Sequence, residues 1–75
     1  MNRLKEFIKS QELEIHYRNC KLNIVGYDKI VFIGEEKIIL LKGSKTINIK
    51  GENLSLLKLL DSEILIDGLI KQIEL

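Results

Sequence analysis

Hydrophobic residues recur at every second position along much of the chain. Leu13, Ile15 and Tyr17 alternate with charged or polar neighbours, and a second alternating run begins after a break of phase at Asn19. Alternation with period two is the pattern of a strand that has one face buried and the other in water, and the break indicates a bulge or a tight turn. Further apolar runs follow at 30–33, 38–41, 46–49, 54–60, 64–66 and 69–75. The pattern predicts an all-β protein of about seven to eight short strands.

Glycines divide these runs at nearly regular intervals. Gly26, Gly34, Gly43 and Gly51 are 8, 9 and 8 residues apart, and Gly68 follows 17 residues later. Glycine reaches left-handed turn conformations at little cost, so Gly26, Gly43, Gly51 and Gly68 are predicted as structural turn glycines. Short strands between frequent turns favour a small antiparallel sandwich or roll. A short β-solenoid is the second interpretation.

The first residues follow a different period. Leu4, Phe7 and Ile8 are spaced i, i+3, i+4, which would put them on one face of a short helix over 2–10. The sequence therefore predicts a single domain over 1–75, with an N-terminal helical arm at 1–11 and a sheet domain at 12–75. So short a helix must dock on something to be stable.

Two of the apolar runs, 30–33 and 38–41, are hydrophobic on both faces. In a two-layer fold one face of each strand packs inside, so the outward side chains need a cover. That cover is either the N-terminal helix or a second copy of the protein, and the pattern leaves both open. The candidate protein interface comprises Val31, Ile33, Ile39 and Leu41 on the sheet, with Leu4, Phe7 and Ile8 on the helix.

Composition supports a protein that needs partners. Hydrophobic residues number 34 of 75, and 26 of them are Ile or Leu, without any Ala, Pro or Trp. A chain of this size buries only about 60% of its surface, so the monomer leaves apolar area exposed. The net charge is +1 with acidic and basic residues interspersed, which argues against nucleic-acid binding. No apolar run approaches 18 residues and no signal segment is evident, so we expect a cytoplasmic, not transmembrane, protein.

Candidate chemistry is sparse. Glu14 and His16 share a face of the first strand, but two ligands do not make a metal site, and a solvated surface histidine is the better interpretation. Cys20 could act as a nucleophile with His16 as its base, although a small buried apolar residue is the preferred interpretation. As the only cysteine it excludes an internal disulfide.

Two further motifs have ordinary structural explanations. The segment Gly43-Ser44-Lys45-Thr46 lacks the Gly-Lys step of a phosphate-binding loop, and we interpret it as a hairpin turn. The acidic cluster of Asp61, Glu63 and Asp67 lies near two predicted turns and is interpreted as turn-forming and solvated. No catalytic residue, metal site or cofactor is predicted, and the chain is not expected to be an enzyme.

A longer pattern runs from residue 24 to 75. It opens on Ile24-Val25-Gly26, has Ile49-Lys50-Gly51-Glu52-Asn53-Leu54 at its centre, and closes on Ile64-Leu65-Ile66-Asp67-Gly68-Leu69-Ile70. This pattern resembles the YabP/YqfC family of small sporulation proteins of endospore-forming Firmicutes. The resemblance implies an immunoglobulin-like sandwich, a role in spore formation in a family whose members include spore-coat-associated proteins, and no catalytic residues.

From these features together we expect a non-enzymatic structural or assembly factor of sporulation, acting through self-association or protein docking. It would work in the cytoplasm of the sporulating cell, associated with the developing spore. The alternative is a small β module that binds an oligonucleotide or glycan. Sparse aromatic residues and the lack of a basic face argue against that alternative.

Overall fold

The computed structural model describes residues 12–75. Their fold is all-β, as the period-two pattern predicts, and every strand pairing is antiparallel, which excludes the solenoid. The strands are β1 (Glu14–Arg18), β2 (Lys21–Val25), β3 (Lys29–Ile33), β4 (Lys37–Lys42), β5 (Lys45–Leu60) and β6 (Glu63–Glu74). The helix predicted over 2–10 lies outside the described residues. No helix among residues 12–75 is long and apolar enough to cross a membrane.

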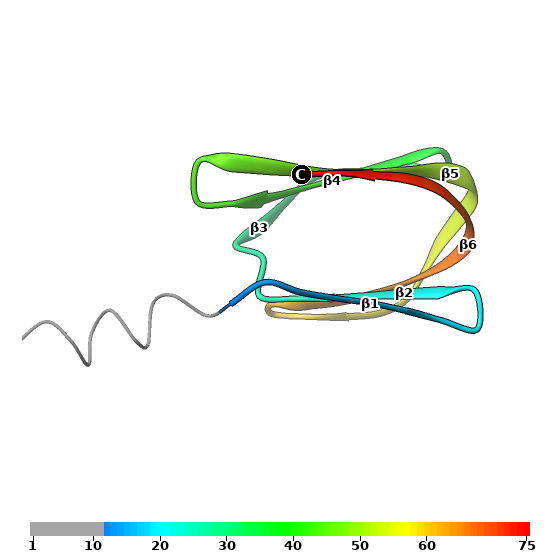
Figure 1. Ribbon diagram of the computed structural model, residues 1–75, viewed down its shortest axis with the longest axis horizontal. Helices are drawn as coiled ribbons and strands as arrows, with labels where there is room; N and C mark the ends of the chain where they lie inside the picture. Colours follow the sequence, from blue (N-terminus) through cyan, green and yellow to red (C-terminus); the bar gives the residue numbers. More distant parts are fainter. Residues whose placement is uncertain (1–11) are drawn as a thin grey trace, which may run out of the picture.

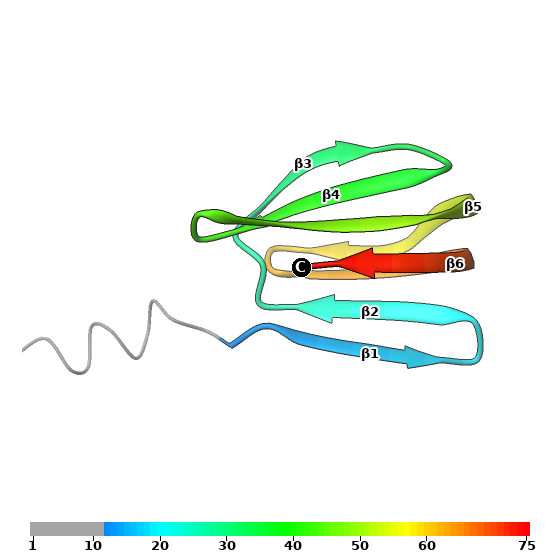
Figure 2. The ribbon, with the colours of Figure 1, turned by 45° about the horizontal axis from the view of Figure 1, so that its top comes forward.

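All six strands belong to one sheet, in the order β1-β2-β6-β5-β4-β3. The sheet is bent across its middle, so that its two halves face each other (Figures 1 and 2). Only β5 and β6 run through the bend. One half contains β3, β4, the beginning of β5 and the end of β6; the other contains β1, β2, the beginning of β6 and the end of β5.

The prediction of seven to eight strands is wrong, because two of the predicted turns are bends within strands. Gly51 lies inside β5 and Gly68 inside β6, where the register of the two strands shifts. A Cβ on Gly51 would overlap the carbonyl oxygen of Leu69, and one on Gly68 would come within 2.7 Å of the carbonyl oxygen of Asn53. The two glycines thus let the long strands approach each other where they bend, and each strand continues past them.

The other two predicted glycines lie between strands. Gly43 and Ser44 form the two-residue connection of β4 and β5, with Lys42 paired to Lys45. Gly43 has φ +64°, and its N–H donates to the carboxylate of Asp28 at 2.6 Å. Gly26 follows β2 with φ +97°. The Gly43 segment is therefore the predicted hairpin turn.

The core lies between the two halves of the bent sheet. Inward-facing residues of β2 and β6 meet those of β4 and β5 in one cluster, as the alternating pattern requires. Because Ile and Leu supply nine of its ten members, the core explains part of the surplus of these residues in the sequence. The members of the cluster are Leu22, Ile24, Tyr27, Ile38, Leu40, Ile47, Ile49, Leu54, Ile64 and Ile66.

Candidate protein interface

Large hydrophobic side chains are exposed along the edges of the bent sheet. Besides the outer strands β1 and β3, the bend creates two further edges, because β2 pairs only with the beginning of β6 and β4 only with the beginning of β5. The end of β5 and the end of β6 therefore each have one unpaired side among residues 12–75. We call the following residues the apolar edge residues: Tyr17, Val31, Phe32, Ile33, Leu57, Leu59, Leu60, Leu69 and Leu75.

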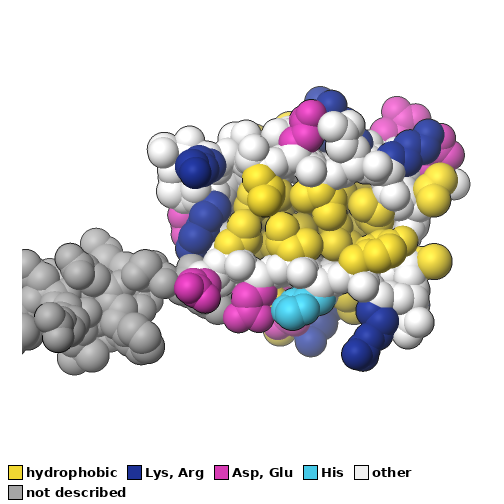
Figure 3. All heavy atoms as spheres, viewed as in Figure 1, with side chains coloured by type: hydrophobic (Ala, Val, Ile, Leu, Met, Phe, Trp, Pro, Cys, Tyr) yellow, Lys and Arg dark blue, Asp and Glu magenta, His cyan; other side chains and the backbone are white. Residues whose placement is uncertain are grey.

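All nine apolar edge residues lie on these four edge segments or directly after one of them. No exposed large hydrophobic residue lies on β2 or β4, which are paired on both sides. Figure 3 shows hydrophobic side chains gathered between the two halves, on the side where β1 and the end of β6 lie. The large exposed hydrophobic side chains of the described chain therefore lie along the edges of the sheet and do not cover one of its faces.

The four sheet residues of the predicted interface do not share one face. In β4, Ile38 and Leu40 are buried, whereas Ile39 and Leu41 point outward and are half-buried. In β3 a bulge at Val31 changes the phase, so that Ile33 lies opposite Ile38 and Phe32 lies opposite Ile39.

Directly opposed residues project to the same side of a sheet, so Ile33 is on the core side and Phe32 is on the outside. The sequence analysis did not predict the bulge, because the run 30–33 is apolar at every position and so does not indicate which residues face the core. Val31 and Ile33 are nonetheless exposed, at 54% and 44%, because β3 is an outer strand. The predicted helix residues Leu4, Phe7 and Ile8 lie outside the described residues.

The end of β5 carries exposed residues that the sequence analysis did not single out. Leu57, Leu59 and Leu60 are each about half exposed. Leu59 and Leu60 line a hollow together with Tyr27, which precedes β3, and Ile30, which lies on β3. The run 54–60 is apolar at both phases, as 30–33 is, and this shared signal could have identified it.

Tyr27 is a buried residue in the lining of that hollow. Its side chain is almost fully covered, and its hydroxyl donates to the carbonyl oxygen of Leu60 at 3.4 Å. Burial raises the pKa of the Tyr27 hydroxyl, and the negative charges of Asp61 and Glu63 raise it further. Two members of the predicted acidic cluster thus act on a core tyrosine, and Asp61 lies in the turn between β5 and β6.

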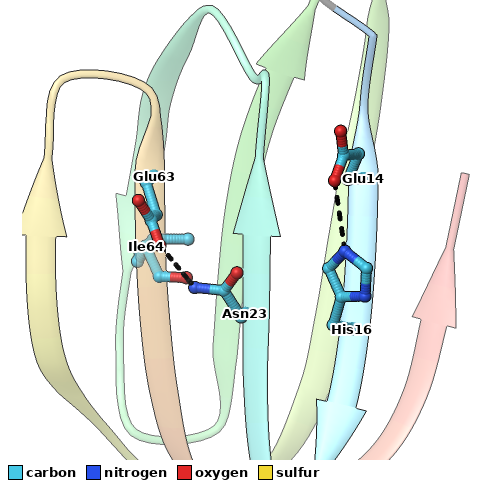
Figure 4. A network of polar contacts seen from close by, with 5 residues as sticks. All are labelled: Glu14, His16, Asn23, Glu63 and Ile64. Carbon is cyan, nitrogen blue, oxygen red and sulfur yellow. Dashed lines mark hydrogen bonds and ion pairs between the residues drawn. The ribbon is translucent and has the colours of Figure 1, made fainter.

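The outer face of β1 carries polar side chains. Glu14 and His16 are exposed and contact each other, with 3.2 Å between the Glu14 Oε1 and His16 Nε2 atoms (Figure 4). On the neighbouring strands Asn23 donates to the carboxylate of Glu63 at 3.0 Å. Residues 12–75 contain no group of three His, Cys, Asp or Glu side chains that could hold a metal ion.

The preference for a buried Cys20 is wrong. Cys20 is exposed, because Asn19 and Cys20 form the two-residue turn between β1 and β2, with Arg18 paired to Lys21. Both turn residues have positive φ, +53° and +60°, as a type I′ turn requires. The break of phase at Asn19 is therefore a tight turn.

No protein-family model, curated protein or solved structure matches the chain. The resemblance to the YabP/YqfC family thus depends on the residue pattern alone. The fold places its opening, Ile24-Val25-Gly26, at the end of β2. The central and closing motifs lie in β5 and β6, and each includes one of the two glycines of the bend.

Proposed function

We propose that this protein is a non-enzymatic assembly factor that binds proteins, including copies of itself, through the edges of its bent sheet. The observation that carries the proposal is that all nine apolar edge residues lie on the four edge segments or directly after one of them. An edge strand offers unpaired backbone N–H and C=O groups, and apolar side chains beside it add area that a partner can bury. Both features favour the addition of strands from another chain.

The biological setting of the proposal comes from the resemblance to the YabP/YqfC family. On this basis the protein acts during spore formation, in the cytoplasm of the sporulating cell and associated with the developing spore. The bent sheet would then be this chain's form of the immunoglobulin-like sandwich that the resemblance implies. Gly51 and Gly68, which belong to the central and closing motifs, are the residues that permit the bend.

Sedimentation velocity over a range of protein concentrations tests the association. We expect the wild-type protein to associate, and at least one of the variants Tyr17→Glu, Val31→Glu and Leu59→Glu to weaken association tenfold or more. A charge at such a position must be desolvated when a partner covers it. Thr46→Glu is the matched control, because Thr46 is exposed near the beginning of β5, where it pairs with Leu41 of β4 and lies outside the four edge segments.

A wild-type protein that stays monomeric and binds no partner would contradict the proposal. So would edge variants that all behave like Thr46→Glu. The sporulation setting is tested separately, by deleting the gene in its host and counting heat-resistant spores. We expect fewer such spores, restored by the wild-type gene and by Thr46→Glu but not by the edge variant that fails to associate.

A further inference from the structure

β1 is the outermost strand on its side of the sheet, and its free side has a defined set of backbone groups. The two-residue turn pairs Arg18 with Lys21, and the closing pair of such a hairpin exchanges both of its backbone hydrogen bonds. Because bonding alternates along an antiparallel pair, Glu14, His16 and Arg18 bond to β2. Ile15 and Tyr17 therefore direct their N–H and C=O groups away from β2, where no strand of residues 12–75 pairs with them.

The side chains of β1 divide between two faces. Glu14, His16 and Arg18 are exposed on the outer face, and Glu14 contacts His16 there (Figure 4). Ile15 packs against the core cluster from the other side, and Tyr17 follows it on that side with 55% of its surface exposed. Along the outer face the order is therefore acidic residue, histidine, basic residue.

This order is complementary to itself when the strand is reversed. We propose that two copies of the protein pair through β1, antiparallel and centred on His16, to form one continuous twelve-stranded sheet. Glu14 of each copy then lies opposite Arg18 of the other, and the two His16 residues lie opposite each other. The proposal rests on the self-association proposed above and specifies its strand and register.

The backbone groups agree with this register. Centring on His16 places Ile15 opposite Tyr17 of the second copy, and both residues have their N–H and C=O groups on the free side. Each of the two Ile15–Tyr17 pairs can then exchange two hydrogen bonds, and all five residues of β1 are paired. The same pairing sets an aromatic ring against a β-branched side chain, which is a favourable cross-strand combination.

Neighbouring registers are less favourable. A shift of the pairing by one residue would oppose backbone groups that point to different sides and would mismatch the two faces. A shift by two in one direction would set Arg18 opposite His16, without an acidic partner. The opposite shift would set Arg18 opposite Glu12 and Tyr17 opposite Leu13, and both of these partners precede β1. The register centred on His16 is therefore the one that opposes Glu14 to Arg18 and pairs all of β1 with β1 of the second copy.

An apolar hollow next to β1 supplies additional area to bury. Tyr17 lines this hollow together with Ile70 and Ile73 of β6, and the hydrophobic band of Figure 3 lies on this side of the molecule. In the proposed dimer Ile15 of the second copy would stand beside Tyr17 and extend the core across the two-fold axis. The exposure of the Tyr17 ring on the core side of β1 thus has an explanation.

Disulfide cross-linking in a Cys20→Gly background tests the register. Opposed residues that do not exchange hydrogen bonds have Cα atoms about 4.5 Å apart, within the range of a disulfide. We expect His16→Cys to form a covalent dimer on mild oxidation. Glu14→Cys is the control from the same strand and face. Its two copies would lie four residues apart, roughly 13 Å, so we expect at least tenfold less cross-linked dimer.

A mixture of two variants sharpens the test. Glu14→Cys mixed with Arg18→Cys should cross-link between the unlike chains, since these positions are directly opposed and the second Glu14–Arg18 pair stays intact.

Charge reversal gives a measurement without a disulfide. Arg18→Glu should weaken dimerisation roughly tenfold, because two attractive pairs become repulsive. The double variant Glu14→Arg with Arg18→Glu should restore it.

The outcomes separate this proposal from the more general one. If sedimentation shows association but Glu14→Cys cross-links as readily as His16→Cys, pairing through β1 in this register is refuted and association by another edge stands. Cross-linking through Lys29→Cys on β3 in place of His16→Cys would lead to the same conclusion. A protein that stays monomeric at every concentration would refute both self-association and this dimer.

Discussion

Replacing Gly51 by alanine should destabilise the fold more than replacing Gly34, the other glycine without a positive φ. The added Cβ would overlap the carbonyl oxygen of Leu69 and stand 3.0 Å from the Leu54 side chain. The Leu69 oxygen belongs to the paired backbone of β5 and β6, so it can move only if the pairing at the bend opens. Overpacking costs about 1–3 kcal/mol, and each lost backbone hydrogen bond costs about 1 kcal/mol.

We therefore expect Gly51→Ala to lower the free energy of unfolding by about 3 kcal/mol. A chain of this length has a total of about 4–11 kcal/mol, at 0.05–0.15 kcal/mol per residue, so the loss is a large fraction. With a urea dependence of about 1 kcal/mol per M, the unfolding midpoint should fall by roughly 3 M. Urea denaturation followed by circular dichroism, at one fixed protein concentration, measures this shift.

Gly43→Ala is the matched control. Gly43 has φ +64°, but a Cβ there would meet no atom within 4 Å. Its replacement should cost only the left-handed backbone strain, about 1–2 kcal/mol. If Gly51→Ala lowers the free energy of unfolding no more than Gly43→Ala does, the close approach of β5 and β6 at Gly51 does not shape the bend. The explanation of why β5 and β6 continue past the predicted turns would then be wrong.

Two further predictions concern the core tyrosine and the first turn. Because the pKa of Tyr27 is raised in the folded chain, the folded state holds this proton more tightly than the unfolded state. The ionisation of Tyr27 should therefore leave the free energy of unfolding unchanged below pH about 10 and lower it as the pH rises above that value. Urea unfolding across alkaline pH should show a steeper loss for wild type than for Tyr27→Phe, and equal slopes would contradict the assignment. Cys20→Gly creates an Asn-Gly type I′ turn and should raise the free energy of unfolding by about 0.5–1 kcal/mol; a decrease would argue against the positive φ of residue 20.

The alternation of apolar and polar residues was sufficient to predict an all-β fold, although not the number of strands. Leu22 and Ile24, for example, are the inward positions of β2 in the pattern and are fully buried in the structure. The hairpin turn at Gly43 was also predictable, because the residues that favour a turn act locally. Structure that depends on a few neighbouring residues can therefore be predicted from the sequence.

The bend was harder to predict, because it depends on contacts between distant residues. Gly51 and Gly68 look like turn glycines in isolation, and only the pairing of β5 with β6 gives them another role. A signal did exist, since an isolated glycine within a strand pattern suggests a bulge or a close backbone approach. The edge at the end of β5 follows from the bend, so Leu57, Leu59 and Leu60 could not be placed on an edge without it.

The passage of β5 and β6 through both halves has a consequence for the order in which the protein folds. Most pairings join strands that are neighbours in the sequence, but Leu22 of β2 pairs with Ile66 of β6, far along the chain. During synthesis the hairpin of β1 and β2 is made before the other four strands, yet its apolar side has no sheet to join until residues 63–67 emerge from the ribosome. Until then Leu22 and Ile24 remain exposed to water and to other nascent chains. β6, the last of the six strands to be made, is thus the strand through which β1 and β2 join the sheet.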